Sequence, residues 1–186
     1  MRIIGGTARG KTLVAPEGLD TRPTSDRLRE ALFNILAPRV PDARVLDLFG
    51  GTGALSAEAL SRGAAYAAVV DLAPQAARAI RKNCDLKGVS GRAEVFECDW
   101  RKAVGRLRGP FDIVFLDPPY RMTEVYAEAF LALAGTGLLA EDAVVVMEYA
   151  ADARIPLPEE ADVFDERKYG AARVKFVRVR QKGEVE

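Results

Sequence analysis

Histidine is absent from this chain of 186 residues. Without an imidazole side chain, the protein has no histidine general base, no Ser-His or Cys-His nucleophile pair and no histidine-based metal site. Its chemistry must therefore depend on carboxylates, backbone groups or a cofactor. We expect no metal ion in its site.

Cysteine and long apolar runs are also scarce. Cys84 and Cys98 lie apart without a CxxC spacing, which is typical of reduced thiols in a cytoplasmic protein. No apolar run approaches the roughly 18–20 residues of a membrane helix, and the apolar stretch that begins the chain is too short for a secretory signal. The length fits one domain of ordinary size. We therefore expect a single cytoplasmic domain over residues 1–186.

The net charge is zero, but the basic residues are unevenly placed. Residues 1–14 contain Arg2, Arg9 and Lys11 and no acid, and residues 164–182 are rich in Lys and Arg. If both segments meet on one face, they form a basic pole that suits a nucleic acid. Solvated strand faces explain the same charges equally well.

Strand-like and helix-like segments alternate through most of the chain. A helix predicted over residues 25–36 has N-cap candidates in Thr24, Ser25 and Asp26. The alternation predicts a parallel sheet covered by helices on both faces. The predicted strands are 43–49, 67–72, 92–98, 111–117 and 143–149, and the predicted helices among them are 54–62, 74–87 and 123–134, with a short helix before the fourth strand.

The two ends of the chain depart from this alternation. Residues 2–4 and 11–14 flank the turn GGTARG, so we expect a small β-hairpin extension over residues 1–20 before a core of residues 21–186. The last quarter predicts two antiparallel strands joined by a turn at Tyr169–Gly170. Because the charged residues change phase along the second strand, we expect a bulge or twist near Phe176–Val177.

The segment VLDLFGGTGALSAEA reads as a strand, a glycine-rich turn and the start of a helix. Gly51, Gly53 and Ser56 nearly match the GxGxxG pattern, and Asp71 ends the next strand. Glycines let a ligand approach backbone N–H groups, while a carboxylate at that place accepts ribose hydroxyls. This pattern alone permits a dinucleotide.

Acidic residues around the turn favour a different ligand. Asp47 would place a negative charge where a pyrophosphate lies, which is unfavourable. The ammonium and sulfonium groups of S-adenosylmethionine suit Asp47 better. Asp99 could accept a hydrogen from the adenine amine, and Trp100 could flank the ring, although ordinary core packing explains Trp100 equally well.

Residues 111–120, FDIVFLDPPY, end an apolar strand in an acid and two prolines. The nitrogen of an exocyclic base amine is a poor nucleophile because its lone pair is delocalised into the ring. The Asp117 carboxylate and the Pro118 carbonyl can accept the two amine hydrogens and aim the lone pair at an activated methyl group. Tyr120 offers a flat face on which the base can stack.

With these motifs the chain resembles the class I S-adenosylmethionine-dependent aminomethyltransferases, most closely the bacterial 16S rRNA guanine-N2 methyltransferase family (RsmD-type). The similar segments are RIIGG, RPTSDRLREALFNIL, VLDLFGGTGALSAEAL, FDIVFLDPPY and KYGAARVKFVR. The resemblance implies an α/β Rossmann-like fold with a mostly parallel seven-stranded sheet, an antiparallel C-terminal hairpin and a small N-terminal β-hairpin. It also implies a monomer that acts on 16S rRNA within the small ribosomal subunit or its assembly intermediate.

The resemblance also assigns roles to residues. Those implied to hold S-adenosylmethionine are Asp47, Phe49, Gly51, Gly53, Asp71, Leu72, Asp99 and Trp100. Those implied to hold the target amine and base are Asp117, Pro118 and Tyr120. Those expected to contact the RNA are Arg2, Arg9, Lys11, Arg22, Thr24, Arg173 and Lys175. Arg22 and Thr24 would approach either the carboxylate of the cofactor or the RNA, and a purely structural role at the helix start explains them equally well.

Three other functions remain open from the sequence. An adenine-N6 methyltransferase acting on DNA or RNA uses the same DPPY chemistry, although a DNA enzyme usually has a separate target-recognition region for which 186 residues leave no room. A nicotinamide-dependent oxidoreductase would explain the glycine turn and Asp71 but neither Asp47 nor DPPY. A non-catalytic ribosome-assembly factor with a relic cofactor pocket would not need the intact set of acceptors.

Overall fold

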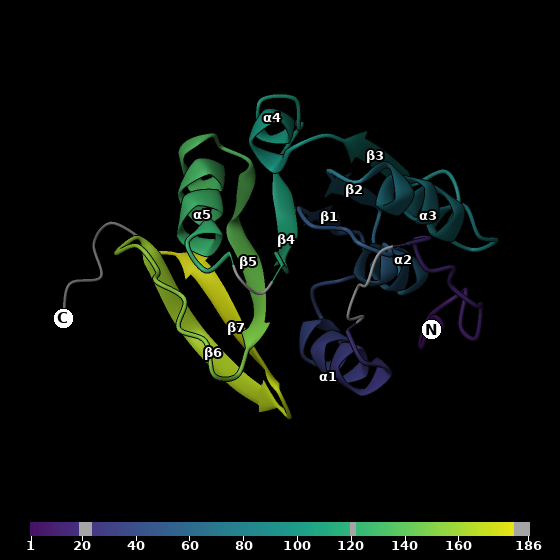
Figure 1. Cartoon of the computed structure of the whole chain (residues 1–186), viewed down its shortest axis with the longest axis horizontal. Helices are drawn as coiled ribbons and strands as arrows, with labels where there is room; N and C mark the ends of the chain where they lie inside the picture. Colours follow the sequence, from purple (N-terminus) through teal and green to yellow (C-terminus); the bar gives the residue numbers. More distant parts are fainter. Residues whose placement is uncertain (19–23, 120–121, 181–186) are drawn as a thin grey trace.

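A twisted sheet forms the centre of the computed structural model, which describes residues 1–18, 24–119 and 122–180 (Figure 1). Within these residues the sheet has seven strands in the order β3-β2-β1-β4-β5-β7-β6. Neighbouring strands among β1 to β5 pair in parallel, and β7 pairs antiparallel with both β5 and β6. The strands are β1 (Arg44–Asp47), β2 (Tyr66–Asp71), β3 (Ala93–Glu97), β4 (Phe111–Leu116), β5 (Leu139–Ala150), β6 (Ala161–Tyr169) and β7 (Ala172–Val179).

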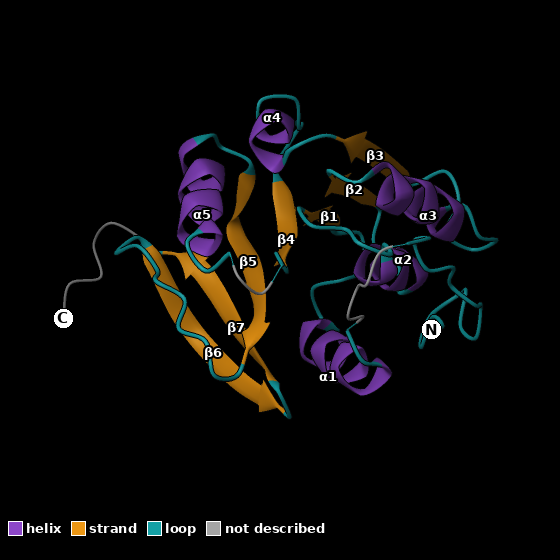
Figure 2. Ribbon diagram, viewed as in Figure 1, coloured by secondary structure: helices purple, strands orange, loops and turns teal. Residues whose placement is uncertain are grey.

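Helices cover both faces of this sheet, as the alternation predicted (Figure 2). One apolar core includes residues of α1, α2 and α3, and the other includes residues of α4 and α5. The helices are α1 (Asp26–Leu36), α2 (Ala54–Ser61), α3 (Pro74–Cys84), α4 (Trp100–Val104) and α5 (Val125–Gly135). None of the helices in the described part of the chain is long and apolar enough to cross a membrane.

The central strands are apolar along their length because both of their faces are covered. Val45 and Leu46 of β1 are fully buried, as are Ile113 and Val114 of β4. β1 ends at Asp47, earlier than predicted, because the chain turns out of the sheet toward the glycines that follow. β5 begins at Leu139, earlier than predicted, through its pairing with Phe111.

Among the three N-cap candidates, Ser25 begins α1. Its Oγ accepts a hydrogen bond of 3.2 Å from the backbone N–H of Leu28, which satisfies one free donor of the first turn. The apolar face of α1 then buries Leu32 and Phe33 against the sheet. This places Thr24, directly before the cap, beside the carboxyl ends of the central strands.

The N-terminal segment, residues 1–18, does not form the predicted β-hairpin. Its two arms meet in one isolated antiparallel bridge, between Arg2 and Thr12. The N–H groups of Ile4 and Gly5 donate instead to the carboxylate of Glu58 on α2, at 2.7 and 2.8 Å. The arms exchange backbone hydrogen bonds only around the bridge, from the N–H of Ile3 to the carbonyl of Lys11 at 2.9 Å and from the N–H of Leu13 to that of Met1 at 3.0 Å. A β-hairpin of two strands is therefore not shown within residues 1–18.

The C-terminal strands form the predicted antiparallel pair, with Gly170 in the left-handed region (φ 61°) at the turn. The register passes from Val163 opposite Val177 to Asp165 opposite Phe176. The extra residue is therefore Phe164 of β6. The predicted bulge near Phe176–Val177 is confirmed, and it lies on the partner strand.

Candidate active site

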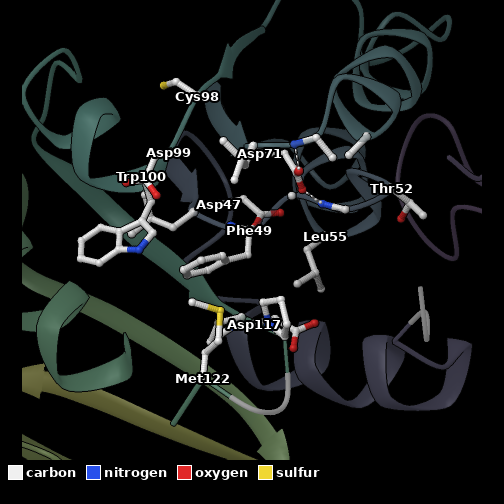
Figure 3. A pocket seen from close by; sticks show the side chains of 18 of the residues that line it. Asp47, Phe49, Thr52, Leu55, Asp71, Cys98, Asp99, Trp100, Asp117 and Met122 are labelled. Carbon is white, nitrogen blue, oxygen red and sulfur yellow. Dashed lines mark hydrogen bonds between the residues drawn. The ribbon is translucent and has the colours of Figure 1, made fainter. Parts of the chain in front are cut away.

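A cavity of about 600 Å³ opens at the carboxyl ends of the parallel strands (Figure 3). Its wall includes Asp47–Thr52 after β1, Asp71–Ala73 after β2, Cys98–Arg101 after β3 and Asp117–Pro119 after β4. β1 and β4 are neighbours in the sheet although they are distant in the chain, and ligands of open α/β sheets bind at such a switch in strand order. The cavity is therefore the candidate active site.

The glycine-rich turn forms one wall of this cavity. Gly51 and Gly53 have positive φ angles of 54° and 72°, a region in which residues with a side chain are strained. Gly50 lies against β2, where a Cβ atom would come within 2.5 Å of Val69 Cγ1. The turn is thereby pressed onto the sheet, and the start of α2 faces the cavity.

Asp71 presents an oriented carboxylate to the cavity. Its Oδ2 accepts from the backbone N–H of Gly51 and its Oδ1 from that of Ala73, both at 2.8 Å (dashed in Figure 3). Burial raises the pKa of this carboxyl group, and the two backbone hydrogen bonds oppose the shift. Each oxygen keeps acceptor capacity, so the group can receive a pair of ligand hydroxyls. Leu72, 68% exposed, adds an apolar surface at the mouth.

Asp47 brings a second acid to the cavity from the end of β1. Its Oδ1 accepts from the N–H of Phe49 at 3.4 Å and its Oδ2 from Ser56 Oγ at 3.2 Å. Burial raises its pKa to about 7, opposed by those two hydrogen bonds and increased by the charge of Asp71. In the part of the chain that the structure describes, no Lys or Arg pairs with Asp47. A cationic ligand would stabilise its charged form.

The raised pKa of Asp47 predicts how stability depends on pH. Between about pH 4 and 7 the folded protein keeps a proton on Asp47 that the unfolded chain releases, so raising the pH through this window lowers the free energy of unfolding. In Asp47→Asn the side chain does not ionise, and its amide still presents polar atoms to Phe49 and Ser56. Without ligand, we expect Asp47→Asn to gain stability over the wild type on going from pH 5 to pH 8 in chemical denaturation. A constant difference between the two proteins would contradict the assignment.

Asp117 and Pro118 follow β4 and line the cavity. The pKa of Asp117 is raised well above its ordinary value, first by burial and then by the charges of Glu148 and Asp47. Leu116 is in register with Met147, so Asp117 and Glu148 come next on neighbouring strands. The ends of β1, β4 and β5 thus hold three neighbouring carboxyl groups.

Glu148 was not predicted from the sequence. It is 7% exposed, and its Oε2 accepts from Thr24 Oγ1 at 3.0 Å, which links β5 to the residue before the α1 cap. The signal that could have found it is its position in AVVVMEY, an acid near the end of an apolar strand. Asp47 and Asp117 were found by that same pattern.

Asp99 and Trp100 lie on the wall formed after β3. Asp99 caps α4 by accepting from the N–H of Arg101 at 2.9 Å, and the Arg101 guanidinium lies 4.5 Å from the centre of the Trp100 ring. Trp100 is 6% exposed, and its Nε1 has no hydrogen-bond partner among the described residues. Trp100 belongs both to the core and to the cavity wall, so the two interpretations of this residue are compatible.

The remaining predicted residues, apart from those of the basic segments, separate into two groups. Phe49 and Thr24 line the cavity, together with Leu55 and Met122, which the sequence did not indicate. Tyr120 and Arg22 lie outside the described residues.

The two basic segments do not meet on one face. The N-terminal segment lies beside α2, whereas β7 lies across the molecule with α1 between them (Figure 1). Arg173 and Lys175 of β7 both pair with Glu166 of β6, at 2.9 and 2.8 Å. The sheet order separates the ends of the chain, so the condition for a single basic pole is not met.

An antiparallel hairpin at one edge of the sheet and a cavity that opens onto a DPP turn distinguish this chain from the dinucleotide-dependent dehydrogenases. They place it in the class of Rossmann-like methyltransferases. The profile of the family described as Conserved hypothetical protein 95 matches residues 1–178. The ribosomal RNA small subunit methyltransferase D of Escherichia coli K12 is 36% identical over 186 residues, which are 99% of this chain and 92% of that protein. The chain belongs to this rRNA methyltransferase family.

Solved structures agree with this assignment. The Escherichia coli protein yhhF superimposes with a TM-score of 0.85 at 34% identity, over 96% of this chain and 97% of that one. A hypothetical protein of Thermus thermophilus, TTHA0928, gives a TM-score of 0.80 at 32% identity, over 96% of this chain and 99% of that one. The fold therefore extends over nearly the full length of these relatives.

Proposed function

We propose that this protein transfers a methyl group from S-adenosylmethionine to the exocyclic N2 amine of a guanine in 16S rRNA. The observation that carries the proposal is the position of Asp117 and Pro118, whose acceptors open onto the same cavity as Asp47 and Asp71. The name of the Escherichia coli relative, a methyltransferase of small-subunit ribosomal RNA, supports this substrate.

The cavity fits S-adenosylmethionine because its acids match the positive and hydroxyl groups of that molecule. Asp47 and the glycine turn would hold the amino acid end, and Asp71 would accept the ribose hydroxyls. Leu72 and Trp100 would enclose the adenine, with Asp99 at its amine. When bound, this cofactor supplies a methyl group activated by a sulfonium.

The protein's contribution to methyl transfer is the positioning of the amine. The Asp117 carboxylate and the Pro118 carbonyl accept the two amine hydrogens, which directs the nitrogen lone pair away from the ring. Tyr120 stacks on the base in this proposal. The N–CH3 bond would form as the S–CH3 bond breaks, the demethylated cofactor would leave as a neutral thioether, and the methylated amine would release one hydrogen to solvent. Such an in-line displacement requires alignment more than acid–base groups, so the absence of histidine is no obstacle.

Removing the Asp71 side chain should weaken cofactor binding. Asp71→Ala leaves the N–H groups of Gly51 and Ala73 and the ribose hydroxyls without their acceptor, a loss of roughly 1–3 kcal/mol in binding free energy. Titration calorimetry with S-adenosylmethionine measures this change, with the exposed Asp152→Ala as a matched control. A wild-type protein that binds NADH and no S-adenosylmethionine would refute the cofactor assignment.

We propose that the protein acts as a cytoplasmic monomer, with residues 1–20 extending a core of residues 21–186. Its substrate is 16S rRNA in the small subunit or in an assembly intermediate. The exposed Arg9 and Lys11 are available to contact phosphates, and so is Arg2. Arg173 and Lys175 would have to leave Glu166 or bind beside it. Arg22 and Thr24 would contact the RNA in this proposal.

RNA affinity should fall steeply with salt, and each lost phosphate contact should reduce the slope of that dependence by about one unit. Because the basic segments are separate, Arg9→Gln with Lys11→Gln and Arg173→Gln with Lys175→Gln should be measured as two independent pairs. A filter-binding salt series on 16S rRNA gives the slopes. A pair whose slope equals that of the wild type makes no phosphate contact.

Labelled S-adenosylmethionine and small subunits from cells that lack the gene test the function directly. The expected product in the digested rRNA is N2-methylguanosine. N6-methyladenosine would establish the adenine-specific alternative. Binding of the RNA without any methyl transfer would favour the assembly factor.

A further inference from the structure

The Thr24 hydroxyl lies between Glu148 and the candidate active site. Thr24 lines the cavity that contains Asp117 and Pro118, and its Oγ1 donates its hydrogen to Glu148 Oε2 at 3.0 Å. Across residues 1–18, 24–119 and 122–180, Thr24 Oγ1 makes no other hydrogen bond. One side of this oxygen is therefore bonded to a buried carboxylate, and the other remains available to a ligand.

This bond determines what the hydroxyl can offer. A free threonine hydroxyl is both a donor and an acceptor, because its hydrogen rotates to suit the partner. Once the Glu148 oxygen accepts that hydrogen, only the lone pairs of Oγ1 remain. Glu148 thus converts Thr24 from an adaptable group into an acceptor.

Both residues are joined to secondary structure. Thr24 directly precedes Ser25, the cap of α1, whose following turn packs Leu28 into the core. Glu148 lies within β5, and its backbone carbonyl accepts from Tyr126 Oη at 2.5 Å. A group fixed from two elements can discriminate between ligands because it does not reorient to accept the wrong one.

The edge of a purine supplies the difference that such an acceptor can detect. In guanine the ring nitrogen beside the N2 amine, N1, carries a hydrogen. In 2-aminopurine the amine is the same, but N1 has a lone pair, as N1 of adenine has beside its own amine. A lone pair directed at an acceptor is repelled, whereas an N–H is bound.

We propose that Thr24, held as an acceptor by Glu148, selects guanine by accepting the hydrogen of N1 while Asp117 and Pro118 hold the N2 amine. This inference rests on the proposed function. It makes Thr24 a specificity-determining residue and Glu148 a positioning residue that acts through it. The neighbouring carboxyl groups of Asp47 and Asp117 also favour a base that presents hydrogen-bond donors on this edge.

The test uses small subunits reconstituted with 16S rRNA that carries either guanine or 2-aminopurine at the position mapped as methylated. The measured quantity is the ratio of kcat/KM for the two bases. For the wild type we expect a ratio of at least about tenfold in favour of guanine, because the wrong base leaves a polar group unpaired. Thr24→Val should lower the ratio by losing turnover on guanine. Glu148→Gln should lower it too, because the amide can donate to Oγ1 as well as accept from it and no longer fixes the hydroxyl as an acceptor. Thr24→Ser, which keeps the hydroxyl, should retain it.

Comparing variants cancels the other difference between these bases, the missing O6 of 2-aminopurine, since its effect does not depend on Thr24. A wild-type ratio near one overturns the inference, and so does a Thr24→Val ratio equal to that of the wild type. If Glu148→Gln lowers both rates by the same factor, Glu148 acts on Asp117 and not through Thr24. A wild-type protein that methylates neither base overturns the proposed function instead. Calorimetry with S-adenosylmethionine confirms that each variant is folded.

Discussion

Replacing Asp117 by alanine is expected to reduce methyl transfer by on the order of a hundredfold or more while leaving S-adenosylmethionine binding unchanged. Asp117 supplies one of the two acceptors for the target amine, so the substitution removes a positioned partner from the transition state. Burial raises the pKa of its carboxyl group, and the charges of Glu148 and Asp47 raise it further by repulsion. Removing it relieves that repulsion, and the fold should be retained.

Asp117→Asn is the more discriminating change at this position. It keeps one acceptor oxygen, so we expect partial activity if the carboxylate aligns the amine and does not remove a proton. At the neighbouring Tyr120, phenylalanine should have a mild effect and alanine a severe one, because stacking requires the ring. Single-turnover rates on small subunits measure these effects. Wild-type rates for Asp117→Ala would mean that DPPY is only a turn.

Glu58→Gln is expected to lower the free energy of unfolding by about 3–5 kcal/mol, the usual result of breaking a buried ion pair. Glu58 is fully buried and accepts from the N–H groups of Ile4 and Gly5 and from Arg62 Nε at 2.7 Å. It also lies 3.8 Å from the Nε of Arg29, which is buried as well. Burial lowers the pKa of Arg29, and the charges of Asp26 and Glu58 oppose that shift.

Urea denaturation measures the change, and Glu30→Gln on the exposed side of α1 is the matched control. Limited proteolysis of the same variant should release the N-terminal segment before the rest of the chain, because Glu58 holds two of its backbone groups. A variant within about 1 kcal/mol of the wild type, the range of a surface pair, would show that Glu58 does not anchor this segment.

The parallel part of the fold was predictable because its signal is local. Each buried strand is a short apolar run, and each helix that follows repeats apolar residues with helical spacing. The cavity lined by Asp47, Asp71 and Asp117 followed from the same signals, since each of these acids ends such a run and strand ends meet at one edge of a sheet. These predictions needed no sequence signal longer than one strand and the turn that follows it.

The N-terminal segment could not be predicted in this way. Its two short apolar arms around a glycine turn are typical of a hairpin, but the N–H groups of Ile4 and Gly5 donate to Glu58 of α2, more than fifty residues along the chain. The sequence of α2 does not indicate that this helix binds the N-terminal segment. Glu58 and Ser61 resemble the solvated face of an ordinary helix, but both are buried. The pairing of Thr24 with Glu148 is of the same kind, a contact between distant residues with no local pattern.

Mass mapping of 16S rRNA tests the central claim most directly. The rRNA should be compared between cells with the gene, cells without it, and deleted cells that express either the wild type or Asp117→Ala. The account predicts one guanine that carries a methyl group on N2, that loses it on deletion, and that regains it with the wild type and not with Asp117→Ala. An rRNA whose methylation is the same in all four strains, or a lost methyl group that belonged to an adenine, would contradict it.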